Sequence, residues 1–165
     1  MCAVRFNSFS QTPATCSEWT TLKTDTVTGK ITVVSKEVLM VSADHGKTGL
    51  SIYSFLNSRS KVVIISIQAI GAGKCVDKGD KINILFEDDA RLDLTNTNDF
   101  NCDGSSTLYF GGGLGNHNEM QLLLSRKVKT MRVWTRDDYM QVDFHDADAV
   151  TFMETLRCLF NSLSN

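Results

Sequence analysis

This 165-residue chain has one proline, no long apolar run and no large excess of charge of either sign. The longest strongly apolar stretch, residues 62–70, is interrupted by Ser66 and Gln68 and is far shorter than the roughly 20 residues that span a bilayer. Seventeen basic and nineteen acidic residues leave a formal net charge of −2, so no global field attracts nucleic acid. We therefore expect no membrane span and no duplex nucleic acid as a partner.

The motifs of the common enzyme classes are also missing. The glycine-rich residues 111–115 follow an expected strand, but Asn118 breaks the dinucleotide-binding G-x-G-x-x-G pattern. His45, His117 and His145 fall in expected loops without metal-binding spacing, and the chain has no G-x-S-x-G segment. The sequence therefore favours a protein that is not an enzyme.

The five cysteines, Cys2, Cys16, Cys75, Cys102 and Cys158, are widely spaced and form no zinc-binding pattern. Cys158 falls among apolar helix positions, which predicts a small core residue. Cys75 and Cys102 fall in expected loops, and a disulfide between them is an open alternative if the protein is exported. The first residues show no signal-peptide pattern, so we expect a cytoplasmic protein, or an exported or lipid-anchored one if a leader was removed.

Apolar patterns along the chain indicate a mostly β domain. Alternating or β-branched segments predict strands at about residues 31–34, 38–41, 50–56, 62–67, 82–86, 92–94, 107–110, 131–134 and 139–144. Residues 120–124 are apolar, but their pattern does not distinguish a helix from a strand. Residues 1–11 show no period and predict a loose arm, which leaves residues 12–165 as a single β-rich domain.

The C-terminal segment predicts an amphipathic helix at about residues 147–163, with Asp146 as its N-cap. Its apolar stripe is expected to pack against the strands and consists of Ala149, Phe152, Met153, Leu156, Leu159, Phe160 and Leu163. The predicted fold is therefore an antiparallel sheet or partly open barrel packed against one C-terminal helix. A last strand that leads directly into such a helix resembles the ending of a pleckstrin-homology-like barrel.

Three short segments also resemble small uncharacterised β-rich proteins of Bacteroidetes-type bacteria: residues 75–82, 99–104 and 156–159. This resemblance implies a bacterial protein, and proteins of that type are often exported or lipid-anchored. It implies no activity, because no assigned function accompanies it.

The loop at residues 99–104 matches the first half of a calcium loop. Asp99, Asn101 and Asp103 offer oxygen ligands at alternate positions, followed by a glycine where the chain turns sharply. Phe110 stands where an EF-hand has its bidentate Glu, and no helical pattern flanks the loop, so the EF-hand interpretation fails. A looser Ca²⁺ site remains the alternative to an ordinary turn rich in Asp, Asn and Gly.

Five of the seventeen basic residues lie within eleven positions: Arg126, Lys127, Lys129, Arg132 and Arg136. If Arg132 shares an exposed strand face with Trp134, a basic groove with an aromatic platform suits a small anionic ligand or a single nucleic-acid strand. Alternation sends Lys127 and Lys129 to the opposite face unless a bulge intervenes. A solvated strand edge is the competing interpretation.

The sequence thus favours a non-enzymatic binding or protein-interaction module. Its candidate ligand-binding residues are Arg126, Lys129, Arg132 and Trp134. One alternative is a calcium-type domain or small enzyme built around residues 99–104. Another is a structural subunit that adds an edge strand to a protein partner, and fold class alone does not decide between these functions.

Overall fold

A computed structural model describes residues 16–71, 74–114 and 116–162, so the arm expected at residues 1–11 lies outside the described residues. Within this part the chain forms ten strands and two α-helices. Their bounds are β1 (Thr20–Thr24), β2 (Ile31–Ser35), β3 (Leu39–Ala43), β4 (Thr48–Asn57), β5 (Val62–Ile70), β6 (Lys81–Phe86), β7 (Arg91–Thr95), β8 (Ser105–Gly111), α1 (His117–Ser125), β9 (Val128–Trp134), β10 (Tyr139–Asp143) and α2 (Asp146–Asn161).

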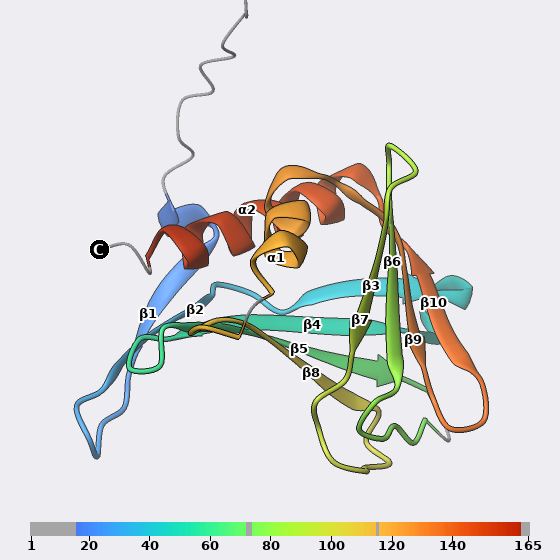
Figure 1. The fold of residues 1–165 in the computed structure, drawn as a ribbon, viewed down its shortest axis with the longest axis horizontal. Coiled ribbons are helices and arrows are strands. Elements are labelled where there is room, and N and C mark those ends of the chain that lie inside the picture. Colours follow the sequence, from blue (N-terminus) through green and yellow to red (C-terminus); the bar gives the residue numbers. More distant parts are fainter. Residues whose placement is uncertain (1–15, 72–73, 115, 163–165) are drawn as a thin grey trace, which may run out of the picture.

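The strands form two open antiparallel sheets rather than a closed barrel (Figure 1). The first sheet has the order β1-β2-β4-β5-β8, and β3 pairs with the part of the β4 edge that β2 leaves open. The second sheet has the order β10-β9-β6-β7. The predicted mostly β fold with a C-terminal helix is confirmed.

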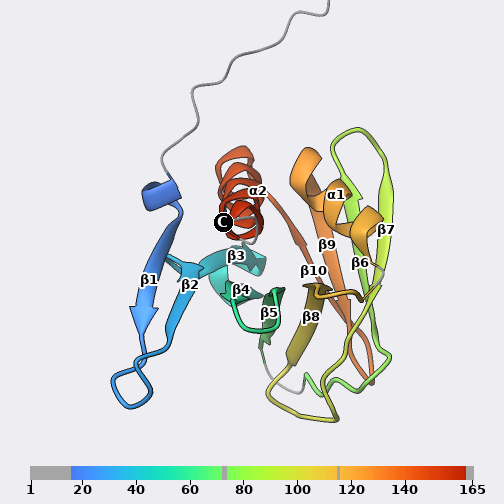
Figure 2. The same cartoon turned by 60° about the vertical axis from the view of Figure 1, so that its left-hand side comes forward.

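A single core lies between the two sheets, and the helices lie along the opening between them (Figure 2). Alternation along most of the strands sends every second side chain inward, where burial removes apolar surface from water. The inward side chains that are fully or almost fully buried include Leu50, Ile65 and Ile67 of the first sheet, Ile82, Met131 and Val133 of the second, and Phe152, Leu156 and Leu159 of α2. The predicted stripe of the C-terminal helix is therefore buried from Ala149 to Leu159, Phe160 is partly buried, and Leu163 lies outside the described residues.

Helix α2 starts one residue earlier than predicted and ends at Asn161, before the predicted end at about residue 163. His145 occupies the N-cap position without a side-chain cap hydrogen bond, and Asp146 is the first helical residue, so the predicted N-cap is wrong. Asp146 and Asp148 nevertheless place negative charge in the first turn, which the helix dipole favours. None of the helices in the described part of the chain is long and apolar enough to cross a membrane.

Two elements have no clear signal in the sequence. The ambiguous segment at residues 120–124 belongs to α1, a nine-residue helix that buries only Met120 and Leu123. Arg157 of α2 donates its Nε–H to the backbone carbonyl of Leu124 at 2.6 Å, which satisfies an acceptor at the end of α1. Strand β1 lies at the margin of the first sheet, where four of its five residues are exposed (Figures 1 and 2).

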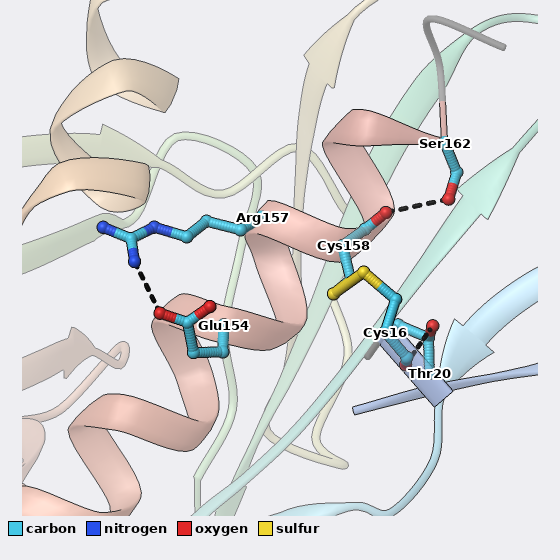
Figure 3. The surroundings of a disulfide bond; sticks show 6 residues. All are labelled: Cys16, Thr20, Glu154, Arg157, Cys158 and Ser162. Atoms are coloured by element: carbon cyan, nitrogen blue, oxygen red, sulfur yellow. Dashed lines mark hydrogen bonds and ion pairs between the residues drawn. A yellow bond between two sulfur atoms is a disulfide. The ribbon is translucent and has the colours of Figure 1, made fainter. Parts of the chain in front are cut away.

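Two disulfides join distant parts of the chain. Cys16, just before β1, is bonded to Cys158 of α2 across a sequence separation of 142, with the Cα atoms 5.5 Å apart (Figure 3). The interpretation of Cys158 as a simple core residue is therefore incomplete, because its side chain is both buried and covalently bonded. Cys75 is bonded to Cys102 in the second disulfide, which joins the two loops that also meet in the Val76–Asn101 bridge.

Candidate functional site

Arg132 and Trp134 lie on the outer face of the second sheet. Met131 and Val133 alternate with them and are fully buried, which confirms the predicted orientation of this strand. The same alternation in the other three strands places further polar side chains on this surface. We call it the β9 face, and it consists of Lys81, Asn83, Leu85, Arg91, Asp93, Thr95, Thr130, Arg132, Trp134, Tyr139, Gln141 and Asp143.

Two aromatic rings and a guanidinium group form one end of the β9 face. Trp134 and Tyr139 are cross-strand partners, with ring centroids 5.4 Å apart and ring planes inclined by 59°. The guanidinium carbon of Arg132 lies 4.2 Å from the centroid of the Tyr139 ring and 5.8 Å from that of Trp134. Cation–π attraction therefore positions the Arg132 side chain against both rings.

A row of polar side chains crosses all four strands next to these rings. The pairing register aligns Gln141 with Arg132, Arg132 with Asn83, and Asn83 with Asp93. Arg132 donates two hydrogen bonds to Gln141 Oε1, at 3.1 Å from Nε and 2.6 Å from the terminal nitrogen. Asn83 donates to Asp93 Oδ1 at 2.7 Å and accepts from the indole nitrogen of Trp134 at 2.5 Å.

The other two candidate ligand residues lie elsewhere. Arg126 forms an ion pair with Asp88, and Lys129 Nζ lies 3.8 Å from a carboxylate oxygen of Asp89. Both acids belong to the turn between β6 and β7. The register between β6 and β9 shifts beside Lys129, so this residue is the extra one of a β-bulge and leaves the alternation of the strand. The structure therefore divides the predicted basic groove into two surfaces.

Lys127 is also paired, with an acidic side chain at the beginning of α2. Its ammonium group contacts the carboxylate of Asp146, and this hydrogen bond raises the pKa of Lys127 above its usual range. Its positive charge is therefore partly neutralised. The basic segment of the sequence contributes Arg132 to the β9 face, whereas Arg126, Lys127 and Lys129 each have an acidic partner.

The calcium-type loop has the hydrogen bonds of a structural turn. The Asn101 carboxamide donates to the backbone carbonyls of Asp99 and Ser105 and accepts from the Ser105 N–H. Asp103 contributes its backbone carbonyl to Gln68. Within residues 16–71, 74–114 and 116–162, no three His, Cys, Asp or Glu side chains lie close enough together to hold a metal ion. The oxygen of Asn101 that a cation would need is thus already engaged.

A buried amide whose structural role the sequence did not predict organises the loops around this turn. Asn96 is 1% exposed, donates to the Asp77 carbonyl at 2.8 Å, and accepts from the N–H groups of Asn98 and Thr107 at 3.0 Å each. An Asn in a polar loop is common, so only the burial of Asn96 distinguishes it from its neighbours.

Sequence reasoning also missed Asn83, Asp93 and Gln141, the polar residues that complete the β9 face. Alternation places each of them outward, but it does not say which strands are neighbours. These side chains become one surface only through the order β10-β9-β6-β7. Comparison of the chain with protein-family models, curated proteins and solved structures finds no match, so the β9 face is interpreted from its own geometry.

Proposed function

We propose that this domain is a non-enzymatic binding module whose ligand lies on the β9 face. The observation that carries the proposal is the exposed pair of rings, Trp134 and Tyr139, beside the Arg132 guanidinium. The rings remain 38% and 40% exposed although they neighbour each other. Aromatic rings with polar groups at their margin, and Arg among them, are enriched where proteins bind partners.

The side chains of the β9 face are arranged before any ligand arrives. The indole nitrogen of Trp134 is bonded to Asn83, and the Arg132 guanidinium is bonded to Gln141 and stacked on Tyr139. Ordering a long side chain on binding costs about 0.5–1.5 kcal/mol. Intramolecular hydrogen bonds that order these groups in the free protein reduce this cost and so favour affinity.

A groove lies beside the rings on the same surface. It has a volume of about 470 Å³, and its walls include the polar side chains of Arg91, Asp93, Thr130, Arg132 and Gln141. This volume falls within the range of small-molecule sites, roughly 300–1,000 Å³. The rings and the groove together give a ligand an apolar contact and several hydrogen-bonding groups.

Tryptophan fluorescence tests the proposal, because Trp19 and Trp134 are the only tryptophans of the chain. In a Trp19→Phe protein, the emission reports on Trp134 alone. We expect it to change on titration with at least one of three probes: inorganic phosphate, a single-stranded oligonucleotide or a neutral oligosaccharide. Binding measured by calorimetry should be abolished by Trp134→Ala.

Tyr109→Ala is the matched control, since Tyr109 is 39% exposed on the outer face of the first sheet. It should leave binding unchanged. The proposal fails if none of the three probes alters Trp134 emission, or if binding persists in Trp134→Ala.

We also infer that the domain works in an oxidising compartment. Disulfides persist in exported proteins and are rare in the reducing cytoplasm, and this domain carries two of them. Alkylation of protein isolated from its native source, before any reduction, tests the inference. Two disulfides leave one of the five cysteines reactive, whereas a reduced protein has five reactive thiols after denaturation.

A further inference from the structure

The polar row on the β9 face indicates the chemical class of the ligand. We propose that it binds a neutral, hydroxyl-rich ligand of the saccharide class, which lies across the strands along Gln141, Arg132, Asn83 and Asp93. The inference rests on the proposed function, because it concerns the ligand of the same site. Neighbouring strands are 4.7–4.9 Å apart, so a row across four strands is about 14 Å long, enough for a short oligosaccharide.

The row keeps both donors and acceptors that the hydrogen bonds among its own residues do not use. Gln141 accepts from Arg132 through Oε1, and its two amide N–H groups have no partner within the described part of the chain. Asp93 accepts one hydrogen bond through Oδ1, and its second oxygen has none among the described residues. A hydroxyl group both donates and accepts, so it can contact an amide N–H and a carboxylate oxygen together. A phosphate oxygen without a proton only accepts.

The charges of the β9 face are nearly balanced. Lys81, Arg91 and Arg132 are basic, whereas Asp93 and Asp143 are acidic, and the four-stranded register intersperses the two signs. The carboxylates of the face therefore offset much of the attraction that its basic groups have for an anion. The contacts of a neutral ligand do not depend on that balance.

The aromatic rings at the end of the row suit the apolar faces of a sugar ring. A pyranose ring presents hydroxyl groups at its edge and C–H groups on its faces. The exposed rings of Trp134 and Tyr139 lie two residues along their strands from Arg132 and Gln141. One sugar unit can thus contact an aromatic ring through its C–H groups while its hydroxyls reach the polar row.

The experiment is an array of neutral and sulfated oligosaccharides probed with the labelled protein, followed by calorimetry of the strongest neutral binder. We expect a neutral ligand to bind with an affinity that is nearly the same at low and high salt. Asp93→Ala and Gln141→Ala should each weaken binding at least about tenfold. Asp93→Asn, which keeps the shape of the side chain, should weaken it less than Asp93→Ala.

Gln121→Ala is the matched control, because Gln121 is exposed on α1 and is not one of the residues of the β9 face. It should not change the affinity. If only phosphate, the oligonucleotide or sulfated glycans bind, with Trp134-dependent and strongly salt-sensitive affinity, the saccharide inference is overturned and the proposed function stands. If no glycan binds and no probe alters Trp134 emission, both are overturned.

Discussion

At the scale of single residues, Asn96 is the polar side chain on which the loops around β7 and β8 depend. Asn96→Ala removes an acceptor for two backbone N–H groups and a donor for the Asp77 carbonyl. Each buried group left unsatisfied costs about 1–3 kcal/mol. We therefore expect the free energy of unfolding to fall by at least about 2 kcal/mol in denaturant titration.

Asn118→Ala provides the comparison, since Asn118 is exposed on α1. This substitution should change the free energy of unfolding by less than about 0.5 kcal/mol. A similarly small effect for Asn96→Ala would show that water replaces its hydrogen bonds.

Single residues also show how far the site could be predicted. The outward orientation of Arg132 and Trp134 followed from period-two alternation alone. The positions of Arg126 and Lys129 did not, because their acidic partners Asp88 and Asp89 lie about forty positions earlier in the chain. A sequence shows the density of positive charge, whereas the pairing that neutralises it depends on the fold.

At the scale of elements, α2 joins the two sheets into one folding unit. Leu156 is fully buried in the common core, so Leu156→Ala should reduce the free energy of unfolding by about 2–5 kcal/mol. Denaturant titration measures this change. Asn161→Ala, at the exposed end of the same helix, should have an effect below about 0.5 kcal/mol. A loss under about 1 kcal/mol for Leu156→Ala would mean that α2 can detach from the sheets.

The elements differ in how strongly the sequence predicts them. The apolar stripe of α2 repeats over its whole length, so its identity and nearly its bounds could be predicted. Strand β1 exposes most of its residues, and α1 buries only two, so neither has a period that burial imposes. The β-bulge at Lys129 could not be located from the sequence either, because a bulge is defined by how the strand pairs with its partner, here β6.

At the scale of the whole molecule, the β9 face is assembled by pairing between distant strands. Strand β9 lies between β10, its neighbour in the chain, and β6, which precedes it by about forty residues. Alternation predicted which residues face outward in each strand. It could not bring Asn83 and Asp93 beside Arg132, because strand order is set by packing of the entire core.

The Cys16–Cys158 disulfide also determines how the domain responds to mechanical tension. The ten strands, α1 and most of α2 lie between the two bonded cysteines. A pulling force applied to the ends of the oxidised chain passes from Cys16 to Cys158 through the sulfur atoms and bypasses both sheets. The β9 face therefore stays folded under a load that would extend the reduced chain, and a ligand bound there can be retained while the protein is stretched.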